Sequence, residues 1–193
     1  MKVLGITGGV GSGKSEVLRF LELEYGAVVL KLDEVAKDLQ KRGGACYQEI
    51  IDYFGTEILG EDQELDRKKL AAVVFQDEKK RRRLNEIVHP QVKHFVEQDI
   101  EEKKSRKVPL YVIEAALLPE AGYEQICQEM WYIYTREEVR RERLKQSRGY
   151  SDEKISQMMA SQSSEAAFRA ACQVVIDNSG TFEETKKQIG ENI

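Results

Sequence analysis

The chain has 193 residues, which suits one domain of ordinary size with room for a small inserted subdomain. Its 30 basic and 34 acidic residues leave a formal net charge of -4, so the chain as a whole does not attract nucleic acid or an anionic membrane surface. Any anionic ligand must therefore be bound by a local site.

Cysteine usage and hydropathy exclude further classes of protein. Glycines interrupt the first apolar run almost at once, so no signal peptide is expected, and no stretch approaches the roughly 20 apolar residues of a membrane-spanning helix. We expect a cytoplasmic protein, a monomer by default, that binds neither nucleic acid nor membrane. The three cysteines are far apart and form no C-x-x-C pair, which indicates neither a disulfide framework nor a zinc site: Cys46, Cys127 and Cys172.

Short apolar runs alternate with longer charged segments of helical period. This alternation is typical of an α/β fold, in which helices cover both faces of a parallel sheet. The first helix is expected to start near Gly13, to end at Gly26 and to turn Val17, Leu18, Phe20 and Leu21 toward the sheet. Five strands are predicted, over residues 3–7, 27–32, 110–114, 130–135 and 173–177.

Two helical segments interrupt this alternation. Residues 34–108 are too many for a simple crossover, and we predict an inserted helical subdomain with Asp77 as a helix N-cap. Residues 136–168 are predicted to form two charged helices, separated by a turn at residues 149–151, which make a candidate lid. Thr135 and Glu138 match a capping box at the start of the first of these helices. No linker composition is present, so residues 1–193 are expected to form a single domain. The apolar positions of the insertion include Leu65, Leu70, Val73, Val74, Phe75, Leu84, Ile87 and Val88.

Residues 8–15 match the phosphate-binding loop G-x-x-x-x-G-K-S, between a strand-like run and an amphipathic helix, as the motif requires. Glycines let backbone N–H groups approach phosphate oxygens, and the helix N-terminus adds its positive dipole end. Lys14 can reach the β- and γ-phosphates, and the Ser15 hydroxyl can ligate Mg²⁺. We predict that ATP, with magnesium, is bound by Gly9, Val10, Gly11, Ser12, Gly13, Lys14, Ser15 and Glu16.

Other interpretations of the loop are weaker. A glycine-rich turn without a ligand needs neither Lys14 nor Ser15. Glu16 is either an outward carboxylate that favours the helix dipole or a group facing the incoming phosphate, and the first is favoured. A GTPase is disfavoured, because N-K-x-D is missing and the D-x-x-G at residues 52–55 ends a helix.

Acidic residues follow two of the predicted strands. Asp33 comes directly after the second run, where an α/β sheet presents ligand-facing residues, and its carboxylate can accept a proton from an acceptor hydroxyl. It can equally N-cap the next helix. Glu114 ends the third run and can act on Mg²⁺; the alternative is an exposed strand-end carboxylate.

Arginines of the candidate lid can neutralise charge on a transferring phosphoryl group. They can equally pair with neighbouring glutamates at helical spacing. We expect one or two to act, with Arg143 first, among Arg136, Arg140, Arg141, Arg143 and Arg148.

Taken together, these residues resemble the dephospho-coenzyme A kinase family over nearly the whole chain. The order and spacing of the matching pieces are more specific than any one motif. They are residues 6–15, Asp33-Glu34-Val35-Ala36, Tyr53-Phe54-Gly55, Leu65-Asp66-Arg67, Val74-Phe75, His89-Pro90, Arg143-Leu144, Gln162 and Val175-Ile176-Asp177-Asn178.

The resemblance implies a P-loop kinase fold with a five-stranded parallel sheet, a helical substrate-binding insertion and a lid. It implies transfer of the γ-phosphate of ATP to the ribose 3′-hydroxyl of dephospho-coenzyme A. Catalytic roles then fall to Asp33, as general base, with Lys14 and Arg143. Acceptor binding would also use Arg67, His89 and Glu114, although Arg67 can instead pair with Asp66 or Asp62. Arg148 and Asn178 would join the ATP site, and Ser15 and Glu114 would hold the metal.

The sequence also departs from the family pattern. Lys31 and Leu32 replace an aspartate and a small residue, Glu16 replaces a hydroxyl residue, and Ser147 stands where a second lid arginine is usual, with Arg148 displaced by one. A carboxylate on a longer stem, Glu114, replaces the usual aspartate-containing stretch. Competing hypotheses are therefore a kinase for another nucleotide or nucleoside, and a nucleotide-binding protein that has lost catalysis.

Overall fold

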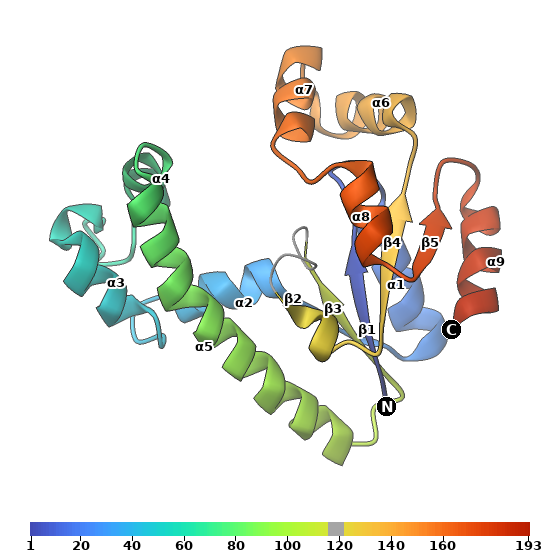
Figure 1. Ribbon diagram of the computed structural model, residues 1–193, viewed down its shortest axis with the longest axis horizontal. Helices are drawn as coiled ribbons and strands as arrows, with labels where there is room; N and C mark the ends of the chain where they lie inside the picture. Colours follow the sequence, from blue (N-terminus) through green and yellow to red (C-terminus); the bar gives the residue numbers. More distant parts are fainter. Residues whose placement is uncertain (116–121) are drawn as a thin grey trace. The chain divides into compact units, whose positions relative to one another are not determined.

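The computed structural model describes residues 1–115 and 122–193 (Figure 1). The chain forms two compact units. The sheet unit comprises residues 1–30 and 106–193, and the helical unit comprises residues 31–105.

The sheet unit is built on a five-stranded sheet in the order β2-β3-β1-β4-β5. β1 pairs in parallel with both β3 and β4, and β4 pairs in parallel with β5. The expectation of an α/β P-loop kinase fold with a five-stranded parallel sheet is confirmed. The strands are β1 Lys2–Thr7, β2 Val28–Lys31, β3 Leu110–Glu114, β4 Glu129–Tyr134 and β5 Val174–Asp177.

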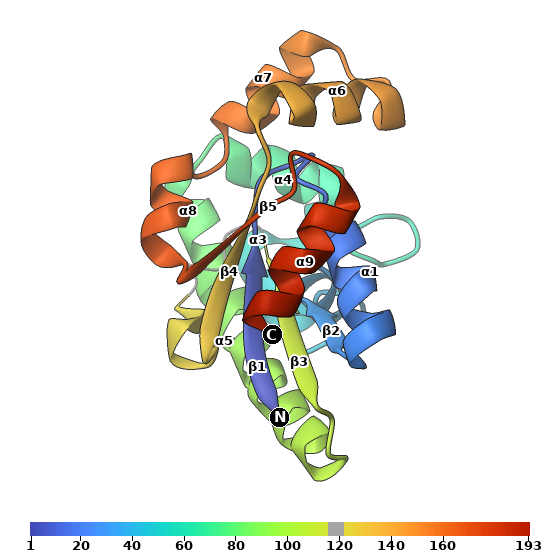
Figure 2. The same ribbon diagram turned by 90° about the vertical axis from the view of Figure 1, so that its right-hand side faces the viewer.

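Helices cover both faces of this sheet, as Figure 2 shows for α1 and α9 on one face and α8 on the other. Alternation along β4 explains the two layers, because Trp131 and Ile133 join the core beneath α1 and α9, whereas Tyr132 stacks on Phe168 of α8 with ring centroids 4.9 Å apart. The helices are α1 Lys14–Tyr25, α6 Glu137–Arg148, α7 Asp152–Ala160, α8 Glu165–Ala171 and α9 Phe182–Asn192, with a short 3₁₀ turn, η3, at Tyr123–Gln125.

The candidate lid differs from its prediction at its start. The predicted capping box is wrong, because α6 begins at Glu137 with Arg136 as N-cap and no side chain caps it. The Thr135 hydroxyl instead donates to backbone carbonyls, including that of Ser12. The break after Gly149 is confirmed, with Ser151 capping α7. A second break, which ends at the N-cap Ser164 before α8, was not predicted.

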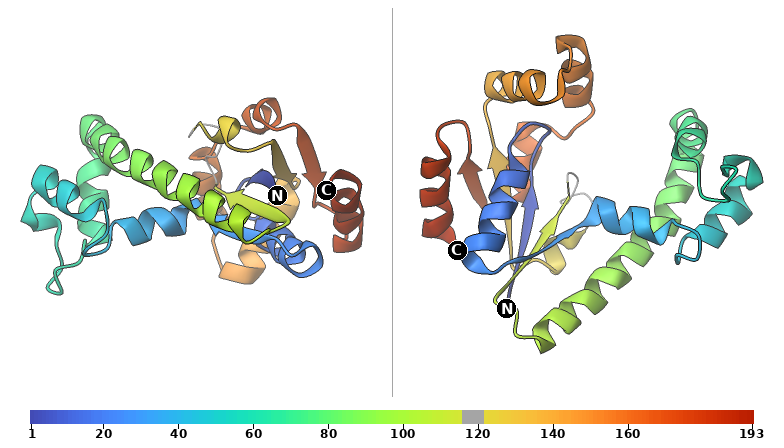
Figure 3. Two further views of the ribbon diagram at one scale, coloured as in Figure 1. Left: turned by 90° about the horizontal axis from the view of Figure 1, so that it is seen from below. Right: turned by 180° about the vertical axis from the view of Figure 1, so that it is seen from behind.

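The helical unit packs α2, α3 and α4 against the long helix α5 (Figure 3). Asp77 is confirmed as an N-cap, because its carboxylate accepts from the N–H groups of Lys79 and Lys80. Phe75, expected among the apolar positions of the insertion, is 91% exposed. The elements are α2 Leu32–Leu39, α3 Tyr47–Phe54, η1 Thr56–Ile58, α4 Arg67–Phe75 and α5 Glu78–Ser105.

The described residues contain neither a candidate membrane-spanning helix nor a disulfide. None of the helices described is both long and apolar enough to cross a bilayer. The three cysteines are free and buried. Burial raises the pKa of Cys172 to about 11, which keeps this thiol protonated and unreactive at neutral pH.

Replacing Ile133 by alanine is expected to lower the free energy of unfolding of the sheet unit by about 2–5 kcal/mol, because the side chain is fully buried and its loss leaves a cavity. Trp131, the single tryptophan, lies in the same core, so its fluorescence during urea unfolding reports on this unit. The control Leu23→Ala, at a side chain 71% exposed, should stay within about 0.5 kcal/mol. Equal shifts for both variants would contradict the assigned core.

Candidate active site

The phosphate loop lies between β1 and α1 and requires glycine where it is most crowded. Gly13, the N-cap of α1, has a φ of 84°, in the left-handed region. A Cβ atom built on it would lie 2.2 Å from Nδ2 of Asn178. Only glycine fits here, which explains this position of the motif.

Lys14 and Glu114, both predicted site residues, are brought together at the carboxyl ends of β1 and β3. The Lys14 ammonium donates to the Gly8 carbonyl at 2.5 Å and lies 3.7 Å from Oε1 of Glu114. Each side chain is 15% exposed, so the pair is largely shielded from solvent. A cation and a carboxylate therefore stand together beside the loop.

Side chains from three further elements hold the back of the loop. The Ser12 carbonyl accepts from the Thr135 hydroxyl and from Nδ2 of Asn178, each at 2.9 Å. The Thr185 hydroxyl of α9 donates to Oδ1 of Asn178 at 2.9 Å. These three side chains are at most 2% exposed. Because a buried polar group is stable only when hydrogen-bonded, this network ties the loop to β4, β5 and α9.

Helix α6 covers the loop through Arg140. Its Nε donates to the Val10 carbonyl at 2.8 Å, and its Nη2 donates at 3.1 Å to Oε1 of Gln162, which also accepts from the Val10 N–H at 3.0 Å. A Cβ atom on Gly9 would lie 2.4 Å from Nη2. Burial lowers the pKa of the Arg140 guanidinium, but an arginine side chain remains charged at neutral pH. The loop thus carries a fixed cation on its outer side.

Two buried polar atoms beside the loop lack partners within the described part of the chain. Arg143 donates from Nη2 to the Asn178 carbonyl at 2.9 Å, but its Nη1 makes no hydrogen bond. The Ser12 hydroxyl is the other such atom. A Cβ atom on Gly13 would lie 3.2 Å from Nη1 of Arg143, which places this donor against the loop. Such orphaned groups call for an explanation, and a bound anion is one.

The other predicted ATP-site residues lie at the surface. Ser15 and Glu16 are exposed in the first turn of α1, which agrees with the outward interpretation of Glu16. Arg148 is exposed at the end of α6, and its hydrogen bond to Tyr150 lowers the pKa of that phenol. Ser147, at the position usually held by a lid arginine, donates to the Arg143 carbonyl. Nothing in these contacts brings Arg148 to the loop.

Asp33 and Arg67 belong to the helical unit, and both are exposed. The N-cap interpretation of Asp33 is wrong, because Lys31 is the N-cap of α2 and no side chain caps that helix. Among the described residues Arg67 pairs with neither Asp66 nor Asp62, whose carboxylates accept from backbone N–H groups. Both charged groups remain available to a ligand.

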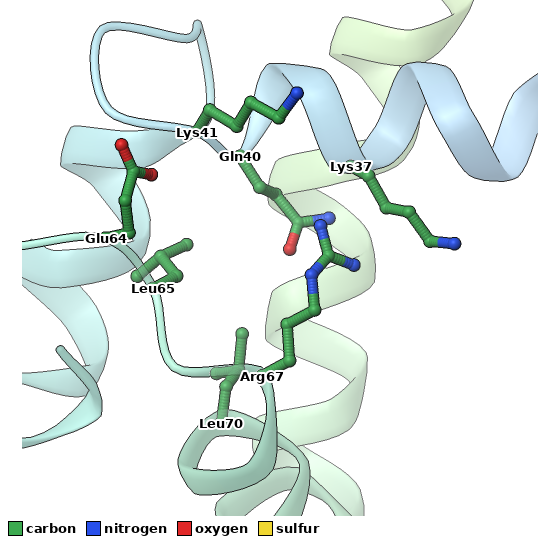
Figure 4. Close-up of a pocket in the computed structure, with 7 residues that line it drawn as sticks. All are labelled: Lys37, Gln40, Lys41, Glu64, Leu65, Arg67 and Leu70. Atoms are coloured by element: carbon green, nitrogen blue, oxygen red, sulfur yellow. The ribbon is translucent and has the colours of Figure 1, made fainter. Parts of the chain in front are cut away.

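A pocket of about 330 Å³ opens beside Arg67 (Figure 4). Lys37, Gln40 and Lys41 line it from α2 and the turn after it. Around the start of α4 it is lined by Glu64, Leu65, Arg67 and Leu70. His89, exposed on α5 before Pro90, does not line it. Of the residues that the sequence assigned to the acceptor, this pocket therefore contains Arg67.

Metal binding rests on few protein ligands. No group of three or more His, Cys, Asp or Glu side chains suited to a metal occurs among residues 1–115 and 122–193. Ser15 and Glu114 offer a hydroxyl and a carboxylate, which are oxygen donors of the kind that Mg²⁺ prefers. Mg²⁺ in kinase sites takes one or two protein ligands and completes its shell with phosphates and water, so this donor set fits it.

Comparisons with known proteins identify the family to which the chain belongs. The family model for dephospho-CoA kinase matches residues 2–184. The chain belongs to the dephospho-CoA kinase family. A dephospho-CoA kinase from Carboxydothermus hydrogenoformans is 38% identical over 190 residues, covering 98% of this chain and 91% of the relative. One from Geobacter sulfurreducens is 38% identical over 191 residues, covering 99% and 96%.

Solved structures extend the likeness to the fold. A crystal structure from Thermus thermophilus superposes with a TM-score of 0.82 at 29% identity, covering 98% of this chain and 95% of that one. Dephospho-CoA kinase from Campylobacter jejuni gives a TM-score of 0.72 at 21% identity, covering 99% and 95%, which shows the fold alone. The expected family and kinase activity are confirmed.

Several residues that hold the loop were not given this role from the sequence. Thr135 was assigned to a helix cap, Arg140 was not favoured over Arg143, and Thr185 was not singled out. Gln162 had a signal through its place in the family pattern, and Arg140 had one as a candidate lid arginine. The hydrogen bond from Thr185 to Asn178 cannot be predicted from the sequence, because it depends on the packing of α9 beside β5.

Thr185→Val is expected to weaken ATP binding several-fold and to lower the free energy of unfolding by about 1–3 kcal/mol, because Oδ1 of the buried Asn178 loses its donor while the side-chain volume is kept. Titration with ATP and urea unfolding followed by Trp131 fluorescence measure the two effects. Thr185→Ser keeps the hydroxyl and is the control. A Thr185→Val variant that matches the natural chain in both would show that the network does not hold the loop.

Proposed function

We propose that this chain transfers the γ-phosphoryl group of ATP to the ribose 3′-hydroxyl of dephospho-coenzyme A, giving coenzyme A and ADP. The observation that carries the proposal is the glycine loop with two buried, unpartnered polar atoms, the Ser12 hydroxyl and Nη1 of Arg143, in a chain of this family. An anionic phosphate chain accepts from N–H and O–H donors, and such atoms supply them.

The donor side uses the loop from Gly9 to Ser15. Its backbone N–H groups and the N-terminus of α1 bind the phosphates, and Lys14 exchanges the Gly8 carbonyl and Glu114 for phosphate oxygens. Arg143 stabilises the charge that spreads over the transferring group. Asn178 acts by holding the Ser12 carbonyl. Glu16 and Arg148, both exposed, would contact ATP from the rim.

Ser15 and Glu114 would hold Mg²⁺, since their oxygen atoms suit a hard cation. When bound, the ion neutralises negative charge on the β- and γ-phosphates. The Lys14 ammonium, which lies beside Glu114 in the structure, would leave this carboxylate and contact the phosphates. The Glu114 carboxylate would also border the acceptor.

On the acceptor side, Asp33 is the general base. Its carboxylate takes the proton of the ribose 3′-hydroxyl while that oxygen forms a bond to the γ-phosphorus and the bond from the γ-phosphorus to the β,γ-bridging oxygen breaks, leaving ADP. The support from this chain is that Asp33 is exposed, close after β2, and caps no helix. Arg67 and His89 would bind the acceptor. Action as a monomer in the cytoplasm stays a prediction.

Asp33→Asn is expected to lower kcat with dephospho-coenzyme A by about 10²–10⁴-fold, because the amide cannot take up the proton. ATP affinity should stay within about twofold, since only the chemical step loses a group. ADP release in a coupled assay and ATP titration measure these quantities.

The matched control is Asp52→Asn, another exposed aspartate of the helical unit, in α3, whose carboxylate accepts from Gln48. It should turn over like the natural chain. Full activity in Asp33→Asn, or an equal loss in both variants, would remove Asp33 from the catalytic role.

Arg143→Met is expected to lower kcat by about 10²–10³-fold, because the transition state loses a cation that stands against the loop. Steady-state ADP release measures the loss. Arg136→Met is the control, since Arg136 is exposed and pairs with Glu138. If Arg143→Met changes only protein stability and leaves kcat unchanged, the arginine serves packing alone.

A further inference from the structure

The pocket beside Arg67 carries positive charge that the described protein does not neutralise. Lys37 and Arg67 line it from two different helices, and neither forms an ion pair or a hydrogen bond within the described ranges 1–115 and 122–193. Figure 4 shows the Arg67 side chain rising from the start of α4 toward α2, which carries Lys37. The same two residues line a further pocket of about 410 Å³. Two cations thus border both pockets, which share these lining residues and are together called the hollow of the helical unit.

The acidic residues around this hollow are already engaged. Asp38 pairs with Lys41 at 2.6 Å, and Glu34 lies 3.3 Å from the ammonium of Lys31. The Glu64 carboxylate accepts from a backbone N–H group at 2.9 Å. A hydrogen bond from a backbone N–H does not cancel the charge of the Glu64 carboxylate, but the two unpaired cations, Lys37 and Arg67, outweigh it. The hollow therefore keeps a net positive charge, which suits an anionic ligand.

Helix α2 joins this charge to the proposed base. Asp33 and Lys37 are four residues apart in α2, so they lie on one face with Cβ atoms roughly 5–6 Å apart. A ligand that offers a hydroxyl to Asp33 can therefore offer an anionic group to Lys37, one helical turn away. Leu65 and Leu70 add an apolar wall to the pocket.

We propose that Lys37 and Arg67 form a subsite for the diphosphate group of the acceptor, with Lys37 as a residue that fixes the acceptor's register on α2. This rests on the proposed function. In dephospho-coenzyme A the ribose carries the reactive 3′-hydroxyl and, through its neighbouring ring carbon, the 5′-diphosphate. The two cations suit a diphosphate in different ways. The Lys37 ammonium acts as a point charge, and the planar Arg67 guanidinium can donate two parallel hydrogen bonds to phosphate oxygens.

The rate at which Lys37 is acetylated, measured in the absence of ATP, tests this subsite directly. Saturating dephospho-coenzyme A should slow acetylation of Lys37 several-fold, whereas pantetheine, which lacks the diphosphate, should not. Lys79, exposed in α5 and in no ion pair with the residues that the structure describes, is the internal reference and should be unaffected by either compound. ATP alone should leave Lys37 reactive. Equal reactivity of Lys37 with and without dephospho-coenzyme A would overturn the subsite.

Charge reversal gives a second, kinetic test. Lys37→Glu and Arg67→Glu should each raise the KM for dephospho-coenzyme A about tenfold or more, because a charge-assisted contact becomes a repulsion. The KM for ATP should stay within about twofold, which also shows that the variants fold. Lys79→Glu is the matched control and should change neither KM.

The results separate the two proposals. If the natural chain phosphorylates dephospho-coenzyme A but Lys37 is not protected and the charge reversals leave its KM unchanged, the subsite is wrong and the proposed function stands. If the natural chain releases no ADP with dephospho-coenzyme A and the compound protects no lysine, both fail.

Discussion

The carbonyl oxygen of Ser12, buried with its residue and bonded by Thr135 and Asn178, is the point on which the phosphate site depends. A loop whose N–H groups turn toward a ligand must direct some carbonyls inward, and a buried carbonyl without a donor is costly. The ends of β4 and β5 supply those donors, and Thr185 fixes the amide of Asn178. The glycine at position 13 follows from the same packing, because Asn178 occupies the space of a side chain.

Local concentration of cations explains how a chain of net charge -4 binds an anionic substrate. Lys14 and Arg140 are held at the loop by backbone carbonyls, and Arg143 by the carbonyl of Asn178, so none of these three needs a carboxylate to fix its position. Carbonyl oxygens orient a cation without cancelling its charge, which leaves it available to phosphate. Lys14 also has a carboxylate close by, that of Glu114, 3.7 Å away. In the helical unit, Lys37 and Arg67 have no ion-pair partner among the described residues, so their charge is also available to an anion.

Sequence reasoning predicted what depends on local pattern and missed what depends on contacts between distant elements. The strands and the glycine loop carry their signal in neighbouring residues, so they were found. Thr135 was predicted as a cap because its neighbours look like a capping box, but the carbonyl of Ser12, distant in sequence, takes its hydroxyl. From the sequence, Asp33 could be either a helix N-cap or a general base. The observed start of α2, with Lys31 as its N-cap, excludes the N-cap role. Gln162 bonds both Val10 and Arg140 through contacts that no spacing rule predicts.

Product analysis of the complete reaction decides whether this chain acts as proposed. The chain is incubated with ATP and Mg²⁺ and with either dephospho-coenzyme A or each common nucleoside monophosphate; ADP is then quantified and the new phosphate located by ³¹P NMR. The account predicts ADP release only with dephospho-coenzyme A, in equal amount to a product phosphorylated on the ribose 3′-oxygen. Robust ADP release with a nucleoside monophosphate, or a new phosphate at any other position, would contradict it.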